Sequence, residues 1–460
     1  MSLIKSISGI RGTIGGKPGE NLTPPDVVSF CAAYGTWLSK NEGDLTVVIG
    51  RDARVSGKMV QEIAMQTLVA MGINVVDLGL STTPTVAMAV MHMKADGGII
   101  ITASHNPEQW NALKFLNNKG EFISAQAGEE ILATIEHQNF HFAQVDALGK
   151  RCTSDDAIEK HIEAILNLEL VKQEAILERK FKIIVDCVNS TGSISIAPLL
   201  QKLGCEFQLI NDDLSGYFSH NPEPLPENLQ DIANRIRNEH FDLGIVVDPD
   251  VDRLAFLCED GSMFGEEYTI VALADYILAF EKGPTVSNLS STQALKNVSE
   301  KYGQPYFASA VGEVNVVAKM KEVKAVFGGE GNGGVIYPDL HYGRDALVGI
   351  ALMLSYLCEK NMKMTEIRSQ LPHYVISKQK VSLEPGSDAD QVIEKLKDKY
   401  QETDHDTVDG LKLIFDGEWV HMRKSNTEPI IRIYAESKDK DSADLLASRF
   451  VTEINQLSAS

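Results

Sequence analysis

Short apolar runs alternate along the first hundred residues with longer segments in which apolar side chains recur every three or four positions. The runs are typical of buried strands, and the spaced pattern is typical of helices with one apolar face. This pattern predicts strands at 45–49, 74–77 and 96–101 and helices at 57–71 and 85–93. Strands that alternate with helices favour a largely parallel sheet with helices on both faces.

The same rhythm returns twice before residue 370. A second round predicts strands at 181–186, 206–210 and 243–247 and helices at 193–203 and 229–239. A third round predicts strands at 253–257, 285–289, 306–310 and 325–327 and helices following residue 266, at 293–302 and at 313–321. Three α/β units of similar length indicate an architectural repeat without clear residue identity.

The pattern changes beyond residue 370. Short β-rich segments are found there at 378–382, 411–415, 419–423 and 430–436. Helical patterns flank them at 387–400 and 440–456. At 460 residues the chain is also too long for one core. We therefore predict an α/β protein with three related α/β domains, whose sheets are mixed and largely parallel, and a smaller C-terminal α+β domain. The predicted domains are 1–150, 151–256, 257–370 and 371–460.

The charge balance restricts the partners of the chain. A net charge of -21, from 43 basic and 64 acidic residues, argues against nucleic acid or an anionic membrane as a partner. The six cysteines include no C-x-x-C pair, which indicates reduced thiols. Residues 1–11 lack the continuous apolar core of a signal peptide, and the longest apolar run, 346–358, is too short to span a bilayer. We therefore expect a cytoplasmic protein.

The loop after the strand predicted at 96–101 is the first candidate site. It reads Thr-Ala-Ser-His-Asn-Pro and contains Ser104. Ligands bind at the carboxyl ends of strands in open α/β sheets, because strand ends and helix N-termini converge there. Ser104, Asn106 and Pro107 could also form an ordinary turn or helix cap. Three further loops with the composition of metal, sugar and phosphate sites favour the ligand-binding interpretation.

The second loop, Asp-Pro-Asp-Val-Asp-Arg at 248–253, lies between two segments predicted as strands. Three carboxylates at alternate positions on a tight loop can point toward one centre, which suits Mg²⁺. A solvated acidic turn is the plainer alternative. A calcium-binding EF-hand loop is a third, since Glu259 falls at its twelfth position, but Arg253 stands where that loop requires a glycine.

The third and fourth loops could bind a sugar and a phosphate. The glycine-rich segment 328–334 offers Glu330 and Asn332 to paired hydroxyls, although a flexible turn has the same composition. The segment 423–429, with Arg432 beyond it, combines hydroxyls, an amide and guanidiniums that could cradle a phosphate dianion. An ordinary hairpin turn is the alternative for this segment.

Together, in this order and over essentially the whole chain, these loops resemble those of the α-D-phosphohexomutase superfamily. The pair Thr-Ala-Ser-His-Asn-Pro and Asp-Pro-Asp-Val-Asp-Arg is highly specific. The resemblance implies three α/β domains and a smaller C-terminal domain around a central cleft, each contributing one loop. It implies an isomerase that moves a phosphoryl group between O6 and O1 of a hexose phosphate. The reaction would pass through a phosphoserine and a hexose 1,6-bisphosphate, which would also serve as activator.

The resemblance also implies roles for individual residues. Ser104 would carry the phosphoryl group, and Lys114 would be a candidate acid or base. The residues implied as catalytic are Ser104, Lys114, Arg11, His105 and His341. Those implied as ligands of Mg²⁺ are Asp248, Asp250, Asp252 and an oxygen of phosphorylated Ser104. Those implied to contact the substrate are Arg253, Glu330, Asn332, Arg423, Ser425, Asn426, Thr427 and Arg432.

Two departures from the family pattern affect the acid or base. Asn111 and Ala112 precede Lys114, where many members have Asn-Gly. Gly334 stands where many members carry a histidine, after the last glycine of the sugar loop. His341 could enter the site instead, although an exposed loop position is the commoner fate of such a histidine.

The sugar loop bears on the substrate. Its Gly-Glu-Gly-Asn-Gly-Gly form is more similar to archaeal-type members linked to glucosamine phosphate or mannose phosphate than to other branches. We therefore predict conversion of glucosamine 6-phosphate to glucosamine 1-phosphate, with phosphomannomutase or phosphoglucomutase activity as the alternative. A metal-dependent phosphatase and a non-catalytic Ca²⁺-binding module remain outside this class. The expected partner is a hexose phosphate, and the expected state is a monomer or homodimer.

Overall fold

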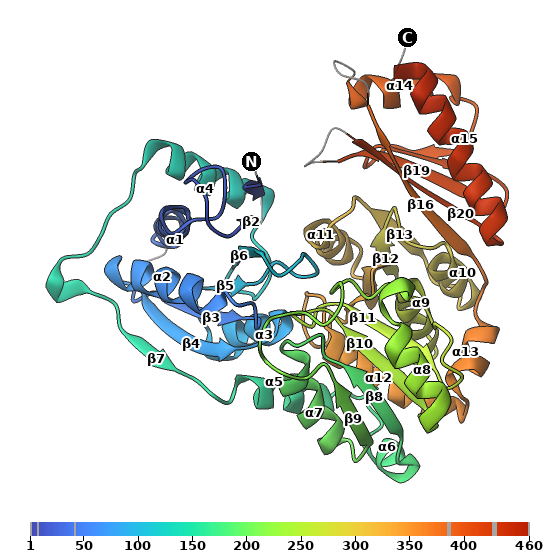
Figure 1. The fold of residues 1–460 in the computed structure, drawn as a ribbon, viewed down its shortest axis with the longest axis horizontal. Coiled ribbons are helices and arrows are strands. Elements are labelled where there is room, and N and C mark those ends of the chain that lie inside the picture. The colour runs from blue at the N-terminus through green and yellow to red at the C-terminus, as the bar shows by residue number, and fades with distance from the viewer. Residues whose placement is uncertain (1, 7–8, 41–42, 384–387, 426–429, 459–460) are drawn as a thin grey trace. The chain divides into compact units, whose positions relative to one another are not determined.

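The computed structural model describes residues 2–6, 9–40, 43–383, 388–425 and 430–458. The chain forms two compact units (Figure 1). The first unit contains residues 1–269 and 332–368, and the second contains residues 270–331 and 369–460.

The N-terminal part of the first unit is built on a mixed sheet with the strand order β1-β2-β6-β5-β3-β4-β7. These strands are β1 (Ile4–Ser6), β2 (Gly9–Thr13), β3 (Thr46–Arg51), β4 (Asn74–Leu80), β5 (Gly97–Ile101), β6 (Trp110–Leu116) and β7 (Arg151–Thr153). β3 runs parallel to β4 and β5, whereas β6 runs antiparallel to β5 and β2. The sequence pattern indicated β3, β4 and β5 and missed β1, β2 and β6.

Helices cover both faces of this sheet (Figure 1). They are α1 (Pro24–Leu38), α2 (Gly57–Ala70), α3 (Thr83–Met93) and α4 (Ala125–His137), and a 3₁₀ turn η1 (Val145–Ala147) follows. Val47 and Ile49 pack in one core with residues of α1, α2 and α4, and Val48 packs in the other core with residues of α3. Successive strand residues point to opposite faces, so an unbroken apolar strand serves two cores.

A second sheet of the first unit has the order β11-β10-β8-β9. Its elements are β8 (Lys182–Asp186), β9 (Glu206–Ile210), β10 (Leu243–Val247) and β11 (Leu254–Cys258), with α5 (Ala157–Leu166), α6 (Gln173–Arg179), α7 (Gly192–Lys202), η2 (Pro226–Asn228) and α8 (Gln230–Glu239). The sequence rhythm assigned β11 to the third round of elements. In the structure it pairs antiparallel with β10, because the short loop 248–253 turns the chain straight back.

Residues 332–368 return to the first unit. They include β15 (Gly334–Ile336) and α12 (Ala346–Lys360), and α13 (Met364–Gln370) begins there. The side chain of Asp345 caps α12, accepting hydrogen bonds from the backbone N–H of Leu347 at 2.8 Å and of Val348 at 3.3 Å. α12 is buried from Ala346 to Leu357 and packs against α5, α6 and α7, as expected for a helix that is apolar all round.

In the second unit, three parallel strands lie in the order β13-β12-β14. The elements of this part are β12 (Thr285–Asn288), β13 (Tyr306–Ser309), β14 (Phe327–Glu330), α10 (Ala294–Lys301) and α11 (Glu313–Val323), preceded by α9 (Glu266–Ile277), which begins in the first unit. α11 packs against all three strands. The predicted strand at 325–327 is found two residues later, so that Glu330 is its last residue.

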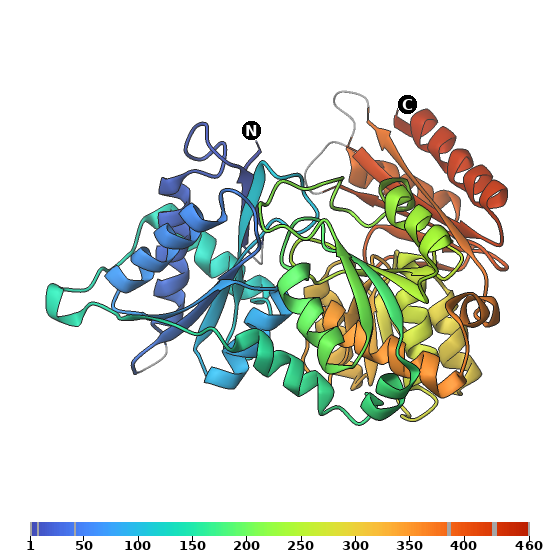
Figure 2. The same ribbon diagram turned by 60° about the horizontal axis from the view of Figure 1, so that its bottom comes forward.

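The C-terminal part of the second unit is an antiparallel sheet with the order β16-β20-β19-β18-β17. Its elements are β16 (Val375–Ser382), β17 (His405–Asp406), β18 (Leu411–Ile414), β19 (Trp419–Lys424), β20 (Ile430–Ser437), α14 (Ala389–Lys399) and α15 (Lys440–Ser458). Figure 2 shows α15 lying along this sheet. Leu446, Phe450 and Ile454 of α15 share one core with Leu396 of α14 and the inward-facing strand residues. This α+β arrangement agrees with the sequence prediction.

Candidate functional site

Ser104 lies three residues beyond the end of β5, in a loop with an unusual backbone. Its φ is 50°, in the left-handed region that non-glycine residues seldom adopt. The backbone N–H of Ser104 donates to Thr102 Oγ1 at 2.9 Å, and its hydroxyl donates to Asp248 Oδ2 at 2.7 Å. The residue is only 8% exposed. The strained turn therefore directs one serine hydroxyl at a carboxylate 144 positions away in the sequence.

Arg54, a residue that the sequence analysis did not single out, holds this loop. Its guanidinium is buried and donates to the backbone carbonyls of Ser104, Asn106, Pro107 and Trp110 at 2.5–3.0 Å. Its Nε donates to Asp52 Oδ2 at 3.0 Å, and the same oxygen accepts the Thr102 hydroxyl at 2.6 Å. A planar, fully bonded guanidinium fixes several carbonyls at once, so the position of the Ser104 backbone depends on Arg54.

The loop between β10 and β11 brings three carboxylates together. Val251, a β-branched residue, has a φ of 60°, which bends the loop sharply between Asp250 and Asp252. The backbone N–H groups of Asp252 and Arg253 donate to Asp248 Oδ1 at 3.2 and 3.1 Å. One carboxylate oxygen from each aspartate lies within 4.8 Å of the others, and all three residues are fully buried.

Side chains of neighbouring elements donate hydrogen bonds to one oxygen of Asp250 and one oxygen of Asp252. Asp250 Oδ2 accepts hydrogen bonds from Thr83 Oγ1 at 2.6 Å and Lys114 Nζ at 3.0 Å, and Asp252 Oδ2 accepts one from Arg344 Nη2 at 2.6 Å. Oδ1 of Asp250 and Oδ1 of Asp252 are buried and have no hydrogen-bond partner in the part of the chain that the structure describes. A buried anionic oxygen without a donor is costly. Unsatisfied oxygens on an all-oxygen donor set fit a hard divalent cation such as Mg²⁺.

The electrostatics of the three aspartates point the same way. Burial raises the pKa of Asp248 well above its ordinary value, and the charges of Asp250 and Asp252 raise it further. Burial would also raise the pKa of Asp250, but the adjacent Lys114 ammonium and the Thr83 hydroxyl hold it below its usual range. Crowded buried carboxylates repel one another, so a bound cation would stabilise the loop.

Lys114 and Arg11 lie on neighbouring strands of the first sheet. Arg11 of β2 is opposite Ala112 of β6, and Lys114 is opposite Gly9, so that both side chains belong to the same face. Lys114 Nζ is 3.0 Å from Asp250 Oδ2 and 3.8 Å from Asp252 Oδ2. Burial lowers the pKa of Lys114, but the charges of Asp250 and Asp252 outweigh it and raise the pKa above its ordinary value. Lys114 is therefore an ammonium beside the three carboxylates.

Two further predicted residues of the first unit, His105 and Arg253, lie beside Ser104 and Asp248 respectively. His105 Nδ1 is 3.4 Å from Ser104 Oγ, and burial, with the charges of Arg253 and Arg344, lowers the pKa of His105 to about 2. Its imidazole is therefore neutral. Arg253 Nε lies 4.0 Å from Asp248 Oδ2, and Arg253 Nη1 lies 3.6 Å from Glu223 Oε1.

Two predicted residues of the first unit make other contacts. His341 is buried, with Nε2 at 3.2 Å from Asp345 Oδ2. Asn332 Oδ1 accepts the backbone N–H of Gly334 at 3.2 Å.

In the second unit, Glu330 is buried at the end of β14 with one carboxylate oxygen fixed. Its Oε1 accepts hydrogen bonds from Asn288 Nδ2 at 2.8 Å and from the backbone N–H of Gly312 at 3.2 Å. Asn288 Oδ1 in turn accepts the Ser291 hydroxyl at 3.1 Å, and that hydroxyl oxygen accepts the backbone N–H of Gly331 at 2.9 Å. This network sets the direction of the Glu330 carboxylate.

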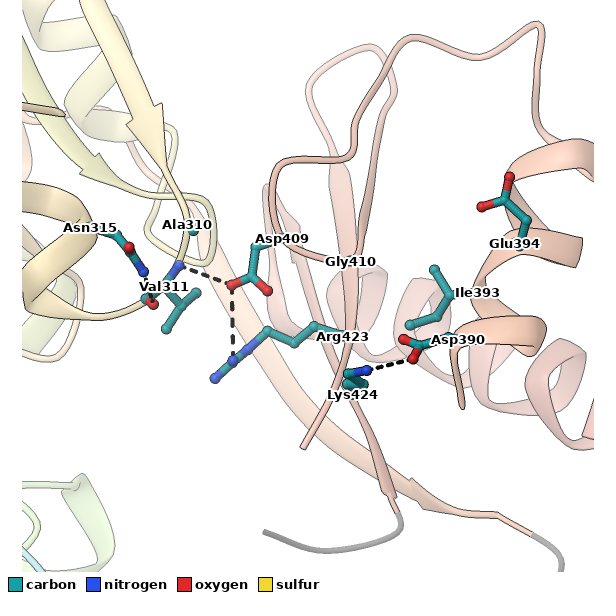
Figure 3. Close-up of a pocket in the computed structure, with 10 residues that line it drawn as sticks. All are labelled: Ala310, Val311, Asn315, Asp390, Ile393, Glu394, Asp409, Gly410, Arg423 and Lys424. Atoms are coloured by element: carbon teal, nitrogen blue, oxygen red, sulfur yellow. Dashed lines mark hydrogen bonds and ion pairs between the residues drawn. The ribbon is translucent and has the colours of Figure 1, made fainter. Parts of the chain in front are cut away.

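Arg423 and Arg432 of the second unit are directly opposite each other on β19 and β20. Arg423 lines a cavity of 380 Å³, shown in Figure 3, where Asp409 Oδ2 lies 4.0 Å from its Nη1 and accepts the backbone N–H of Val311 at 2.9 Å. The backbone N–H of Ser425 donates to the Ile430 carbonyl at 2.9 Å. The predicted residues Asn426 and Thr427 lie outside the described residues.

Family models and curated relatives match almost the whole chain. Four domain models of phosphoglucomutase/phosphomannomutase match the chain in order. They are alpha/beta/alpha domain I at 3–142, alpha/beta/alpha domain II at 159–261, alpha/beta/alpha domain III at 265–374 and the C-terminal domain at 380–453. A phosphoglucomutase/phosphomannomutase of Thermococcus kodakarensis is 34% identical over 94% of this chain and 95% of the relative. The chain belongs to the phosphoglucomutase/phosphomannomutase family.

A second curated relative and a solved structure support the same family assignment. A phosphoglucosamine/phosphogalactosamine mutase of Sulfurisphaera tokodaii is 32% identical over 99% of both chains. The crystal structure of a phosphoglucomutase/phosphomannomutase family protein from Burkholderia thailandensis aligns with a TM-score of 0.84 and 25% identity, over 98% of this chain and 97% of that one. The predicted fold class and the resemblance to phosphohexomutases are confirmed, and the protein is a mutase, that is, an isomerase.

Sequence reasoning missed several residues that organise the site of this phosphohexomutase. Arg54, Thr83 and Arg344 support the Ser104 and Asp248 loops, and Asn288 supports Glu330. A usable signal existed for Arg54, because it closely follows a predicted strand in the run Gly-Arg-Asp-Ala-Arg. Thr83 resembles an ordinary residue of a helix start.

Among the described helices, none is long and apolar enough to cross a membrane.

Proposed function

We propose that the protein interconverts the 6-phosphate and 1-phosphate of a hexose through a phosphoserine at Ser104 and a hexose 1,6-bisphosphate, with glucosamine phosphate as the preferred substrate. The observation that carries the proposal is the Ser104 hydroxyl, buried and 2.7 Å from Asp248 in a group of three aspartates with unsatisfied oxygens. A buried hydroxyl beside a cation site is the arrangement that a phosphoryl carrier needs.

Asp248, Asp250 and Asp252 would hold Mg²⁺ in this mechanism, together with an oxygen of phosphorylated Ser104. When bound, the cation would offset charge on the phosphoryl oxygens. The free hydroxyl of the hexose phosphate attacks phosphorus, the bond from phosphorus to Ser104 Oγ breaks, and the hexose 1,6-bisphosphate is formed. In the second half the bisphosphate has turned over, Ser104 Oγ attacks the phosphorus of the other phosphate, the bond from that phosphorus to the sugar oxygen breaks, and the isomeric hexose monophosphate is released.

The chain's own side chains would supply the remaining charge and the proton. Lys114 and Arg11 share a face of the first sheet, where two cations can stabilise the transferring phosphoryl group. Lys114 is our candidate acid or base, which would take the proton from the attacking hydroxyl and give one to the leaving oxygen, since its Nζ lies 3.0 Å from Asp250 Oδ2 beside the Ser104 loop. We assign no proton transfer to His341, because its Nε2 faces Asp345 in a buried position. His105 would stay neutral and support the Ser104 hydroxyl.

Residues of the sugar and phosphate loops would select the substrate. Glu330, whose carboxylate direction is fixed by Asn288 and Gly312, and Asn332 would accept the sugar hydroxyls. Arg423 and Arg432, paired across two strands, can grip a phosphate dianion from one side. Ser425, Asn426 and Thr427 would complete that grip, and Arg253 would lie near the phosphoryl group.

The similarity of the glycine-rich loop to that of archaeal-type and related bacterial members supports glucosamine phosphate as the substrate, and so does the name of the Sulfurisphaera relative. The Thermococcus relative supports the alternative, a phosphoglucomutase or phosphomannomutase. The test incubates the protein with Mg²⁺, a trace of hexose 1,6-bisphosphate and, separately, the 6-phosphates of glucosamine, glucose and mannose. Phosphorus NMR would follow the appearance of each 1-phosphate.

We expect isomer formation without release of inorganic phosphate, with the largest kcat/KM for glucosamine 6-phosphate. A larger value for glucose or mannose 6-phosphate would assign the alternative sugar. Steady release of inorganic phosphate without isomer would identify a metal-dependent phosphatase. Binding of Ca²⁺ without any turnover would identify a binding module.

A further inference from the structure

A second cluster of metal-ligating side chains lies in the first unit, outside the three aspartates. It consists of His161 on α5, His341 in the segment before α12, and Asp345, the residue that caps α12. All three are buried, with 0%, 4% and 0% exposure. None of them has a part in the reaction proposed above. His161, which is 184 positions from Asp345, thus joins a neighbouring histidine and aspartate at one buried point.

The separations in this cluster suit a small tetrahedral cation. Nε2 of His161 and Nε2 of His341 lie 2.8 and 3.2 Å from the same oxygen, Asp345 Oδ2, and one ligand atom from each residue lies within 4.8 Å of the others. Around Zn²⁺, bonds of 2.0–2.1 Å place tetrahedral ligand atoms about 3.3 Å apart. The two distances to Asp345 Oδ2 are within about 0.5 Å of this value, and the ligand atoms of the two imidazoles lie within 4.8 Å of each other.

The converging atoms contact one another, since both Nε2 atoms lie within hydrogen-bond distance of Asp345 Oδ2, and a bound metal would replace these two contacts. Asp345 Oδ1 accepts the backbone N–H groups of Leu347 and Val348, so that Oδ2 is the oxygen directed at the imidazoles. His161 Nδ1 lies 3.0 Å from Thr85 Oγ1, the kind of outer contact that orients a metal-bound imidazole. His341 Nδ1 has no hydrogen-bond partner among the described residues, so moving the imidazole proton to Nδ1 when Nε2 binds a metal would break no other hydrogen bond.

We propose that His161, His341 and Asp345 bind a divalent transition metal of the zinc class, at a site separate from the magnesium site. Two imidazoles and one carboxylate favour Zn²⁺ or Co²⁺ over Mg²⁺, which takes oxygen ligands. The three aspartates offer oxygen atoms only. The two sites therefore differ in ligand chemistry, and this inference does not depend on the proposed reaction.

The cluster is connected to the aspartate loop through two helix starts. α3 carries Thr83, which donates to Asp250, and Thr85, which contacts His161. The adjacent residues Arg344 and Asp345 contact Asp252 and the two imidazoles respectively. A metal that joins His161, His341 and Asp345 would fix the starts of α3 and α12, and with them two of the donors that orient the carboxylates. Its role would be structural.

The experiment uses the full chain carrying Asp248→Asn and Asp250→Asn, which disable the aspartate site. After chelation and dialysis, the protein is titrated with Co²⁺, whose absorption in the visible range reports tetrahedral nitrogen and oxygen ligation. We expect uptake of about one Co²⁺ per chain with this absorption. Adding His341→Gln should abolish both uptake and absorption, whereas His240→Gln, at an exposed histidine that follows α8, should change neither.

A second measurement leaves every histidine in place. X-ray absorption of the Zn²⁺-loaded Asp248→Asn, Asp250→Asn protein should show scattering from two imidazoles, because the aspartate loop contains no histidine. A spectrum without imidazole ligands would overturn the proposal. So would absence of Co²⁺ uptake, or uptake that His341→Gln leaves unchanged in a protein whose circular dichroism matches the parent.

Discussion

The Ser104 loop and the Arg423 loop both handle phosphate in the proposed mechanism, but they are built differently. Around Ser104, a buried guanidinium bonds four backbone carbonyls and a buried aspartate, and the serine hydroxyl is held at 2.7 Å. Arg423 is partly exposed, and Asp409 Oδ2 lies 4.0 Å from its Nη1. A bond-breaking centre gains from fixed geometry, whereas an anchor that must accept the phosphate of either isomer gains from looser contacts.

Ser104→Ala should have the largest effect, because it removes the atom that would carry the phosphoryl group in the proposed mechanism. We expect kcat to fall at least about 10³-fold while substrate binding is kept. The measurement is isomer formation with a trace of bisphosphate, together with intact mass, which should show a phosphoryl group on part of the parent protein and none on the variant. Ser29→Ala, at a helix residue outside the site, is the control. Full activity of Ser104→Ala would refute the phosphoserine mechanism.

Asp250→Asn tests the metal side of the Ser104 region. The change weakens the cation site and the contact with Lys114 at 3.0 Å. We expect kcat to fall about 10²- to 10³-fold and the Mg²⁺ concentration for half-maximal activity to rise. Chelation of the parent should abolish turnover, and added Mg²⁺ should restore it. Asp231→Asn, at an exposed position of α8, should leave the Mg²⁺ dependence unchanged. An unchanged Mg²⁺ dependence in Asp250→Asn would contradict the assignment.

Arg54→Lys sharpens the comparison, since it keeps the charge and loses the planar group that holds the Ser104 loop. Misplacement of a reacting atom by about 1 Å can cost about 10²-fold, so we expect kcat to fall about 10- to 10²-fold with little change in KM.

The matched control for Arg54→Lys is Arg179→Lys. Arg179 also donates to two backbone carbonyls, those of Leu357 and Met362, but it lies outside the site. Both variants should lower the unfolding temperature, and only Arg54→Lys should lower kcat. Equal kcat losses in the two variants would show that the effect of Arg54 is general destabilisation.

Arg423→Lys should have the smallest effect. It keeps a cation but loses bidentate hydrogen bonding to phosphate, so we expect KM to rise about 10-fold with a modest change in kcat. The neighbouring Lys424, which is exposed and paired with Asp390, provides the control Lys424→Ala, for which KM should stay unchanged. If kcat of Arg423→Lys fell as much as kcat of Arg54→Lys, turnover would depend on fixed geometry in the Arg423 loop as much as in the Ser104 loop.

The sequence indicated the loops that the structure brings together better than the residues that hold these loops in place. Ser104 and the three aspartates stand in loops directly after apolar strands, where their type and spacing carry a chemical meaning. Arg54 and Thr83 work through partners 50 and 167 positions away. Such contacts depend on which strands become neighbours, and periodicity does not encode this. For the same reason β11 was assigned to the wrong round of elements, since an apolar strand does not specify its partner.

If Ser104 carries a phosphoryl group as proposed, its burial bears on how long the group would persist between encounters with substrate. A serine with 8% exposure offers bulk water and passing phosphatases little access to an ester formed on it. Leakage by hydrolysis would then be slow compared with transfer to a sugar that fills the site. Each molecule would remain primed through many turnovers, and bisphosphate would be needed only to recharge the rare one that has lost its phosphate.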